Sequence, residues 1–88
     1  MNDYVRIGLG ILAAAWAYPS IRWLVLSLLD DGVETPPALY TAFRLIPALE
    51  LLAAVITGSW PIAVAAFVTW AALAIAVEIA KRTRPDLL

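Results

Sequence analysis

The segment SWPIAVAAFVTWAALAIAVEIAKR, residues 59–82, decides whether the chain is interpreted as lying in water or in a lipid bilayer. Its apolar body contains a single carboxylate, Glu78, and ends in the basic residues Lys81 and Arg82. A helix rises about 1.5 Å per residue, so a helix of this length crosses the hydrocarbon core of a bilayer. The segment therefore predicts a transmembrane helix.

Composition extends this interpretation to the rest of the chain. Hydrophobic residues make up 64% and charged residues 15% of 88 residues, against about 45–50% and about 25% in an ordinary soluble domain. A soluble chain this short would have too little polar surface to cover itself. We expect a single domain, an all-α integral membrane protein with three transmembrane helices and short connections.

The first helix is expected over residues 4–29, with a kink near Pro19, because the proline ring removes a backbone hydrogen bond. Residues 15–17 (Ala-Trp-Ala) resemble a signal-peptide cleavage site, but hydrophobicity continues for twelve residues past it, which favours a membrane helix. The loop at residues 30–35 contains Gly32, which is expected to close the helix in the left-handed conformation. Thr35 and Pro36 predict the start of the second helix, as N-cap and first helical residue.

The second helix is expected over residues 36–57 and the third over residues 61–82, followed by a tail at residues 83–88. In the turn at residues 58–60, Gly58 closes one helix, Ser59 caps the next, and Pro61 falls in its first turn. A turn this short predicts that the second and third helices form an antiparallel hairpin.

Basic residues predict the orientation. Lys81, Arg82 and Arg84 lie after the third helix, whereas the turn at Gly58 has no charge and the first loop is acidic. The positive-inside rule then places the C-terminus in the cytoplasm and the N-terminus outside. Arg6, near the N-terminus, weakly favours the opposite orientation. The predicted location is the cell (inner or cytoplasmic) membrane or a viral membrane.

Four charges inside the helices are the first candidate site: Arg22, Glu50, Arg44 and Glu78. Counted from the end that carries the first loop, Arg22 lies about 10 Å, Arg44 about 8 Å and Glu50 about 16 Å deep, and Glu78 is shallow. None should face lipid unpaired. Depth matching predicts Arg22–Glu50 and Arg44–Glu78 pairs that hold helices or protomers together. The alternatives are a proton or ion pathway and a pore lining formed on oligomerisation.

Small and aromatic residues form the second candidate set. Small residues that recur every four positions favour close helix contact, here Gly10, Ala14, Ala72, Ala76 and Ala80. The tryptophans predict interface or lipid contact: Trp60 as an interfacial anchor, and Trp16, Trp23 and Trp70 as deeper indoles that need a partner for their N–H.

Several function classes are excluded by what the sequence lacks. With no His and no Cys, the commonest metal ligands, haem ligands and general bases are missing. A net charge of −1 gives no basic footprint for nucleic acid. No base stands in a recognisable spacing to activate a hydroxyl, so we expect no enzyme. We predict no cofactor, catalytic residue or metal site; bound lipid is compatible with the composition.

Three hypotheses for function follow. The first is a small structural or accessory subunit of a larger membrane assembly: a respiratory or photosynthetic complex, a viral membrane, or a secretion or pilus apparatus. Its partners would be the lipid bilayer and other membrane subunits or copies of itself. Second, the layout of the whole chain is similar to class I phage holins, which have three membrane helices, an outside N-terminus and a charged cytoplasmic tail. That resemblance implies an oligomeric pore former. Third, the chain resembles filament subunits of conjugative pili in being small and apolar.

Overall fold

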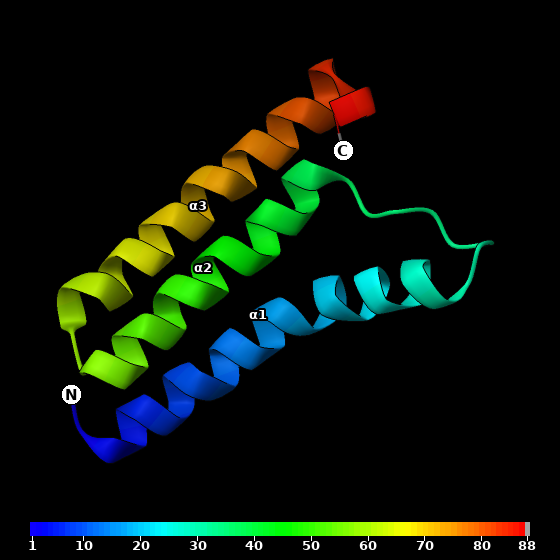
Figure 1. The fold of residues 1–88 in the computed structure, drawn as a ribbon. Coiled ribbons are helices and arrows are strands. Elements are labelled where there is room, and N and C mark those ends of the chain that lie inside the picture. The colour runs from blue at the N-terminus through cyan, green and yellow to red at the C-terminus, as the bar shows by residue number, and fades with distance from the viewer. Residues whose placement is uncertain (88) are drawn as a thin grey trace.

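The chain is entirely helical over the part that the computed structural model describes, residues 1–87. These residues form α1 (Asp3–Leu29), α2 (Ala38–Thr57), α3 (Trp60–Thr83) and a short 3-10 helix, η1 (Pro85–Leu87), without a strand (Figure 1). The three α-helices are each long and apolar enough to cross a membrane. The all-α class is confirmed, and the helices indicate a multi-pass membrane protein.

The end of α1 differs from the expectation for Gly32. The helix stops at Leu29, and the C-cap residue Asp30 is extended, with φ −131°. Asp30 Oδ1 accepts a hydrogen bond of 2.9 Å from the Gly32 N–H, which closes a local side-chain turn. Among the described residues the single glycine with positive φ is Gly58, so the prediction of a left-handed Gly32 is wrong. The aspartate side chain makes the turn that the glycine was expected to make.

The start of α2 also differs. The helix begins at Ala38, two residues later than predicted, and its N-cap is Pro37, without a side-chain hydrogen bond. The predicted cap at Thr35 is therefore wrong. Because a residue that precedes a proline is pushed out of the helical region, Pro36 cannot start the helix in front of Pro37. The steric restriction that Pro37 imposes on Pro36 therefore delays the start of α2 to Ala38.

The connection between α2 and α3 is two residues long. Gly58 is left-handed, with φ 69° and ψ 23°, and Ser59 Oγ accepts from the Ile62 N–H at 3.5 Å. The guanidinium of Arg6 lies against this turn, so close that a Cβ on Gly58 would lie 2.6 Å from Arg6 Nη2. A cation at the C-terminal end of a helix is favoured by the helix dipole. Arg6 thus ties the first turns of α1 to the end of α2.

The helices pack along seams with alternating spacings of three and four residues, as in left-handed coiled coils. On α3 this spacing is followed by the buried residues Ala63, Ala66, Val77 and Ala80 and by the half-buried residues Trp70 and Leu73. On α1 the same spacing buries Ala13, Trp16 and Ser20. The main core is made of Ala13, Trp16, Ala48, Leu51, Ala54, Ala63 and Ala66.

The predicted small-residue stripe does not coincide with these seams. Ala80 is buried, but Ala72 and Ala14 are exposed, and Gly10 and Ala76 are half-buried. A strict four-residue repeat drifts around a helix, whereas the alternating three-and-four spacing follows one face. Apart from Ala80 the stripe therefore lies off the packing seams of residues 1–87, and it stays a prediction for contact with a neighbouring helix.

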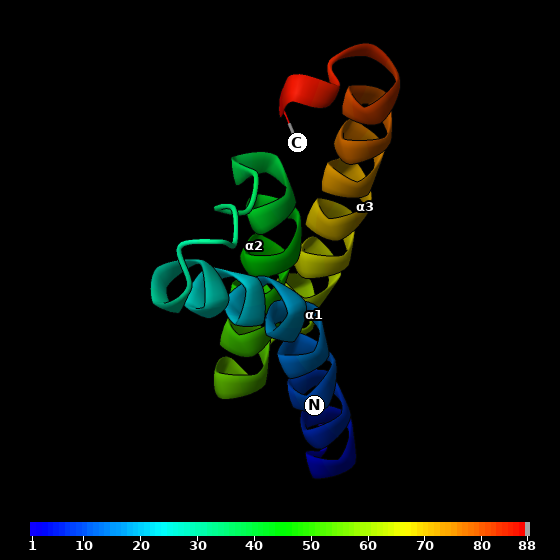
Figure 2. The ribbon, with the colours of Figure 1, turned by 90° about the vertical axis from the view of Figure 1, so that its right-hand side faces the viewer.

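The bundle is closed at one end and open at the other. Near the turn at Gly58, the N-terminal half of α1 lies alongside α2 (Figure 1), and five of the seven core residues contributed by the three helices are alanines. Figure 2 shows the C-terminal half of α1, in cyan, turned away from the direction of its blue N-terminal half. Aromatic rings, rather than alanines, fill the space toward this open end, and larger side chains hold helices further apart.

Candidate functional site

Trp16 joins the three helices through an aromatic cluster. Its ring lies parallel to that of Trp70, with centroids 5.9 Å apart and an interplanar angle of 4°. Phe67 meets it edge-on at 5.5 Å, and Phe43 of α2 contacts Trp70 at 6.0 Å. Such arrangements are favourable beyond the area they bury. Trp16 is 9% exposed, so the predicted deep indole is a core residue of this bundle.

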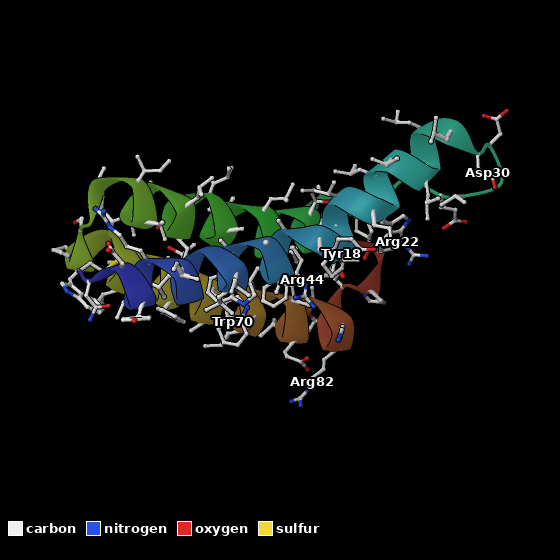
Figure 3. The ribbon with its side chains drawn as sticks, turned by 90° about the horizontal axis from the view of Figure 1, so that it is seen from below. Tyr18, Arg22, Asp30, Arg44, Trp70 and Arg82 are labelled. Carbon is white, nitrogen blue, oxygen red and sulfur yellow. The ribbon has the colours of Figure 1, made fainter. Side chains whose placement is uncertain are left out.

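Arg44 lies on the same side of α2 as the rings. Its guanidinium carbon is 5.4 Å from the Phe43 ring centroid and 5.9 Å from that of Tyr40. Both distances are within the range of cation–π attraction. Arg44 Nε is buried and has no hydrogen-bond partner in residues 1–87. Figure 3 shows Arg44 inside the bundle and Arg82 projecting away from it.

Trp23 connects the open end to the loop. Its ring is 5.6 Å from that of Tyr40, and its Nε1–H donates to the backbone carbonyl of Glu34 at 2.8 Å. The indole therefore holds the outward half of α1, the loop and the first turn of α2 together. The expected partner of this deep indole N–H is a backbone carbonyl of the same chain.

A partly open cavity of about 380 Å³ lies between these groups. It has contributions from the outward half of α1, the start of α2 and the end of α3. Aromatic rings and aliphatic side chains form most of its wall, and three charged side chains reach it. The lining residues are Trp23, Pro37, Tyr40, Phe43, Arg44, Ala74, Val77, Glu78 and Lys81.

The two predicted ion pairs do not form among residues 1–87. The ion pairs in this part of the chain are Glu78–Lys81 at 3.6 Å and Arg84–Asp86 at 3.7 Å, all four side chains more than half exposed. Glu78 pairs with Lys81 because residues three apart on a helix are neighbours, so its nearest cation is on its own helix. The Arg44–Glu78 pair is therefore absent within residues 1–87, although both side chains line the same cavity.

Arg22 and Glu50 do not form an ion pair within residues 1–87 for a different reason. Arg22 lies on the outward half of α1 and is exposed (Figure 3), since the bend carries it away from α2. Glu50 instead faces α3, where its Oε2 accepts a hydrogen bond of 3.2 Å from Thr69 Oγ1. Depth matching placed both residues at comparable levels but could not represent the bend.

Two more buried side-chain atoms, Arg6 Nε and Ser20 Oγ, have no hydrogen-bond partner in residues 1–87. Ser20 follows Trp16 on the seam of α1, is 0% exposed, and its Oγ makes no hydrogen bond to residues 1–87. In the described part of the chain, no three Asp or Glu residues are grouped so that they could hold a metal ion.

Trp60 is 53% exposed at the start of α3, and Lys81, Arg82 and Arg84 are exposed at its end.

The sequence analysis did not single out four residues that contact the candidate residues. Three belong to the aromatic rings around Trp16, Trp70 and Arg44, namely Tyr40, Phe43 and Phe67, and the fourth is Thr69, the partner of Glu50. The spacing of Tyr40, Phe43 and Pro47 along one face of the second helix could have indicated the first two. Thr69 carries no signal in the sequence, because a lone threonine in an apolar helix usually bonds its own backbone. The three-residue spacing of Glu78 and Lys81 could have indicated their pair.

A scan against protein-family models, a search of curated proteins and a search of solved structures each found no match to the chain.

Proposed function

We propose that the chain is a small structural or accessory subunit of a larger membrane assembly, inserted with its N-terminus outside and its C-terminus in the cytoplasm. In this proposal α2 and α3 form a membrane hairpin, and Pro19 causes the bend of α1. The loop at residues 30–37 and the basic end of α3 then lie on the cytoplasmic side, in agreement with the positive-inside rule.

The observation that carries the proposal is an open apolar groove between α1 and α2. Its volume is about 430 Å³, and its wall on α1 is formed by four small residues, Gly10, Ala13, Ala14 and Ala17, and by Ile21. Leu45, Leu49 and Leu52 contribute from α2. Gly10 and Ala14 were predicted to pack helices, yet no third helix of residues 1–87 fills the groove that they line.

A groove of small residues suits a neighbouring transmembrane helix. Helices associate in lipid through close backbone approach, which small side chains permit. Exposed large apolar side chains occur on all three helices, among them Ile11, Leu49 and Val68. The bundle therefore buries little of its apolar surface internally, and we propose that a helix of a neighbouring subunit, another chain or a second copy, fills the groove.

Polar groups support association as well. Arg22 is exposed on an apolar helix, and Arg44 has a buried nitrogen without a partner in residues 1–87. A charge at membrane depth is costly unless a partner compensates it. An acidic residue of a neighbouring subunit would compensate Arg22.

Cysteine crosslinking tests this proposal cleanly because the chain has no Cys. Ala14→Cys should crosslink efficiently in native membranes, to itself if the neighbour is a copy and to a co-purifying chain if it is another subunit. Ala65→Cys is the matched control, being an exposed alanine on α3 that lies outside the groove and outside the predicted small-residue stripe. Equal crosslinking at both positions would contradict the groove as the contact.

Expression in a bacterium separates the holin-like alternative. A subunit should be tolerated and co-purify at fixed stoichiometry. Abrupt growth arrest with loss of membrane potential would instead support an oligomeric pore former, and a filament in the extracellular fraction would support the pilus-type alternative.

A further inference from the structure

We propose that the cavity at the open end of the bundle binds the phosphate group of an amphiphile, an anionic phospholipid, with Arg44 as the principal ligand. This inference rests on the membrane insertion proposed above. It adds a binding site on the side of the molecule formed by α2, α3 and the outward half of α1, distinct from the groove between α1 and α2.

Two cations face the cavity from different helices. Arg44 reaches it from α2 and Lys81 from α3. Arg44 is held by the Tyr40 and Phe43 rings, and its buried Nε has no hydrogen-bond partner in residues 1–87. A guanidinium presents a planar fork of donors that matches the geometry of a phosphate. Arg44 is thus positioned and has free donor capacity.

The charges of the wall favour an anion. Glu78 is the one carboxylate among the lining residues, and it is 3.6 Å from Lys81. Lys81 neutralises that carboxylate, which leaves the charge of Arg44 uncompensated in a wall that is otherwise apolar. A ligand with a negative group would supply the missing counter-charge.

The remaining wall indicates that the ligand also has an apolar part. Trp23, Phe43 and Val77 present rings and an aliphatic side chain to the cavity. Lys81 lies about 3 Å and Arg44 about 9 Å along the helix axes from the ends of α3 and α2. In a bilayer Lys81 then lies near the edge of the hydrocarbon core and Arg44 lies within its outer third, from which a long arginine side chain extends toward the phosphates. A free phosphate would contact the cations but would make no contact with the apolar wall of the cavity.

Native mass spectrometry of the full chain, purified in detergent and mixed with lipid, tests the site. The probes are phosphatidylglycerol, diacylglycerol with the same acyl chains, and inorganic phosphate. We expect phosphatidylglycerol to bind at least about tenfold more tightly than diacylglycerol, since one charge-assisted contact corresponds to about that factor. Inorganic phosphate at equal concentration should not displace the lipid.

Charge variants give the sharper result. Arg44→Gln should weaken phosphatidylglycerol binding about tenfold, the effect of losing one charge-assisted contact. Glu78→Gln should strengthen it, because it removes the competing carboxylate and frees Lys81. Arg82→Gln is the matched control: its side chain projects away from the bundle, and it should leave binding unchanged. Opposite effects of two variants in one cavity cannot come from misfolding.

Three outcomes would overturn the inference. Equal losses in Arg44→Gln and Arg82→Gln would show diffuse surface charge instead of a site. Equal binding of diacylglycerol and phosphatidylglycerol would show that the phosphate is not recognised, and displacement by inorganic phosphate would show a free-phosphate site. All three leave the crosslinking at Ala14 untouched, so this site and the proposed subunit role can fail separately.

Discussion

Replacing Gly58 with alanine should destabilise the protein, whereas the same substitution at Gly8 should stabilise it. Gly58 has φ 69°, a conformation that costs an alanine about 1–2 kcal/mol. A Cβ there would also lie 2.6 Å from Arg6 Nη2, so the guanidinium must leave the end of α2. Gly8 lies within α1, where an added Cβ would meet no atom within 4 Å apart from its chain neighbours and the backbone of its own helix, and a helix interior prefers alanine by about 0.8–1.0 kcal/mol.

The two variants should therefore differ by about 2–3 kcal/mol in the free energy of unfolding, at least about thirtyfold in the equilibrium constant. Titration of the detergent-solubilised chain with a denaturing detergent, followed by helical circular dichroism, measures this difference. Repeating Gly58→Ala in an Arg6→Ala background removes the side-chain displacement and leaves only the backbone cost. Effects of equal sign at the two glycines would refute the reasoning.

Three further substitutions test polar side-chain groups of the helices, all by the same unfolding measurement. Ser20→Ala should stabilise by about 1 kcal/mol or more, since it removes a buried hydroxyl without a partner in residues 1–87, whereas Ser27→Ala should not, because that hydroxyl donates to a carbonyl at 2.8 Å. Thr69→Val should cost about 1.5–3 kcal/mol through loss of the hydrogen bond to its carboxylate partner on α2. Thr57→Val, with an exposed hydroxyl bonded to its own helix, should stay within about 0.5 kcal/mol. Trp23→Phe keeps a ring but loses the indole donor, which should cost about 0.5–1.5 kcal/mol and speed proteolysis of the loop at residues 30–37; unchanged values for Thr69→Val or Trp23→Phe would contradict the hydrogen bonds described.

The three helices were predictable because length and hydrophobicity are sums over many residues, and no single contact can overturn them. Their ends were less predictable. At Pro36 and Pro37 two local rules compete: proline suits the first turn of a helix, but it also excludes the helical conformation from the residue before it. The second rule prevails there, and α2 begins at Ala38.

The sequence singled out several residues that line the cavity but not their partners, and the role of these residues stays a prediction. Arg44, Glu78 and Trp23 were singled out and do gather around one cavity. Their partners were not foreseen, because depth along a helix says nothing about the direction in which a side chain leaves it. Glu78 has Lys81 on its own helix, and Arg22 is carried away by the bend of α1.

The bend of α1 has a consequence for the shape of the surrounding lipid. Because the C-terminal half of α1 turns outward, the bundle is wider across its helices at the open end than at the end near Gly58 (Figure 2). In a bilayer such a tapered body displaces more lipid from one leaflet than from the other. The leaflet that holds the wide end is effectively expanded, and the bilayer relieves the difference by curving toward that side. In the orientation proposed above, many copies in one patch would add their small contributions, so the chain would concentrate where the membrane is already convex toward the cytoplasm.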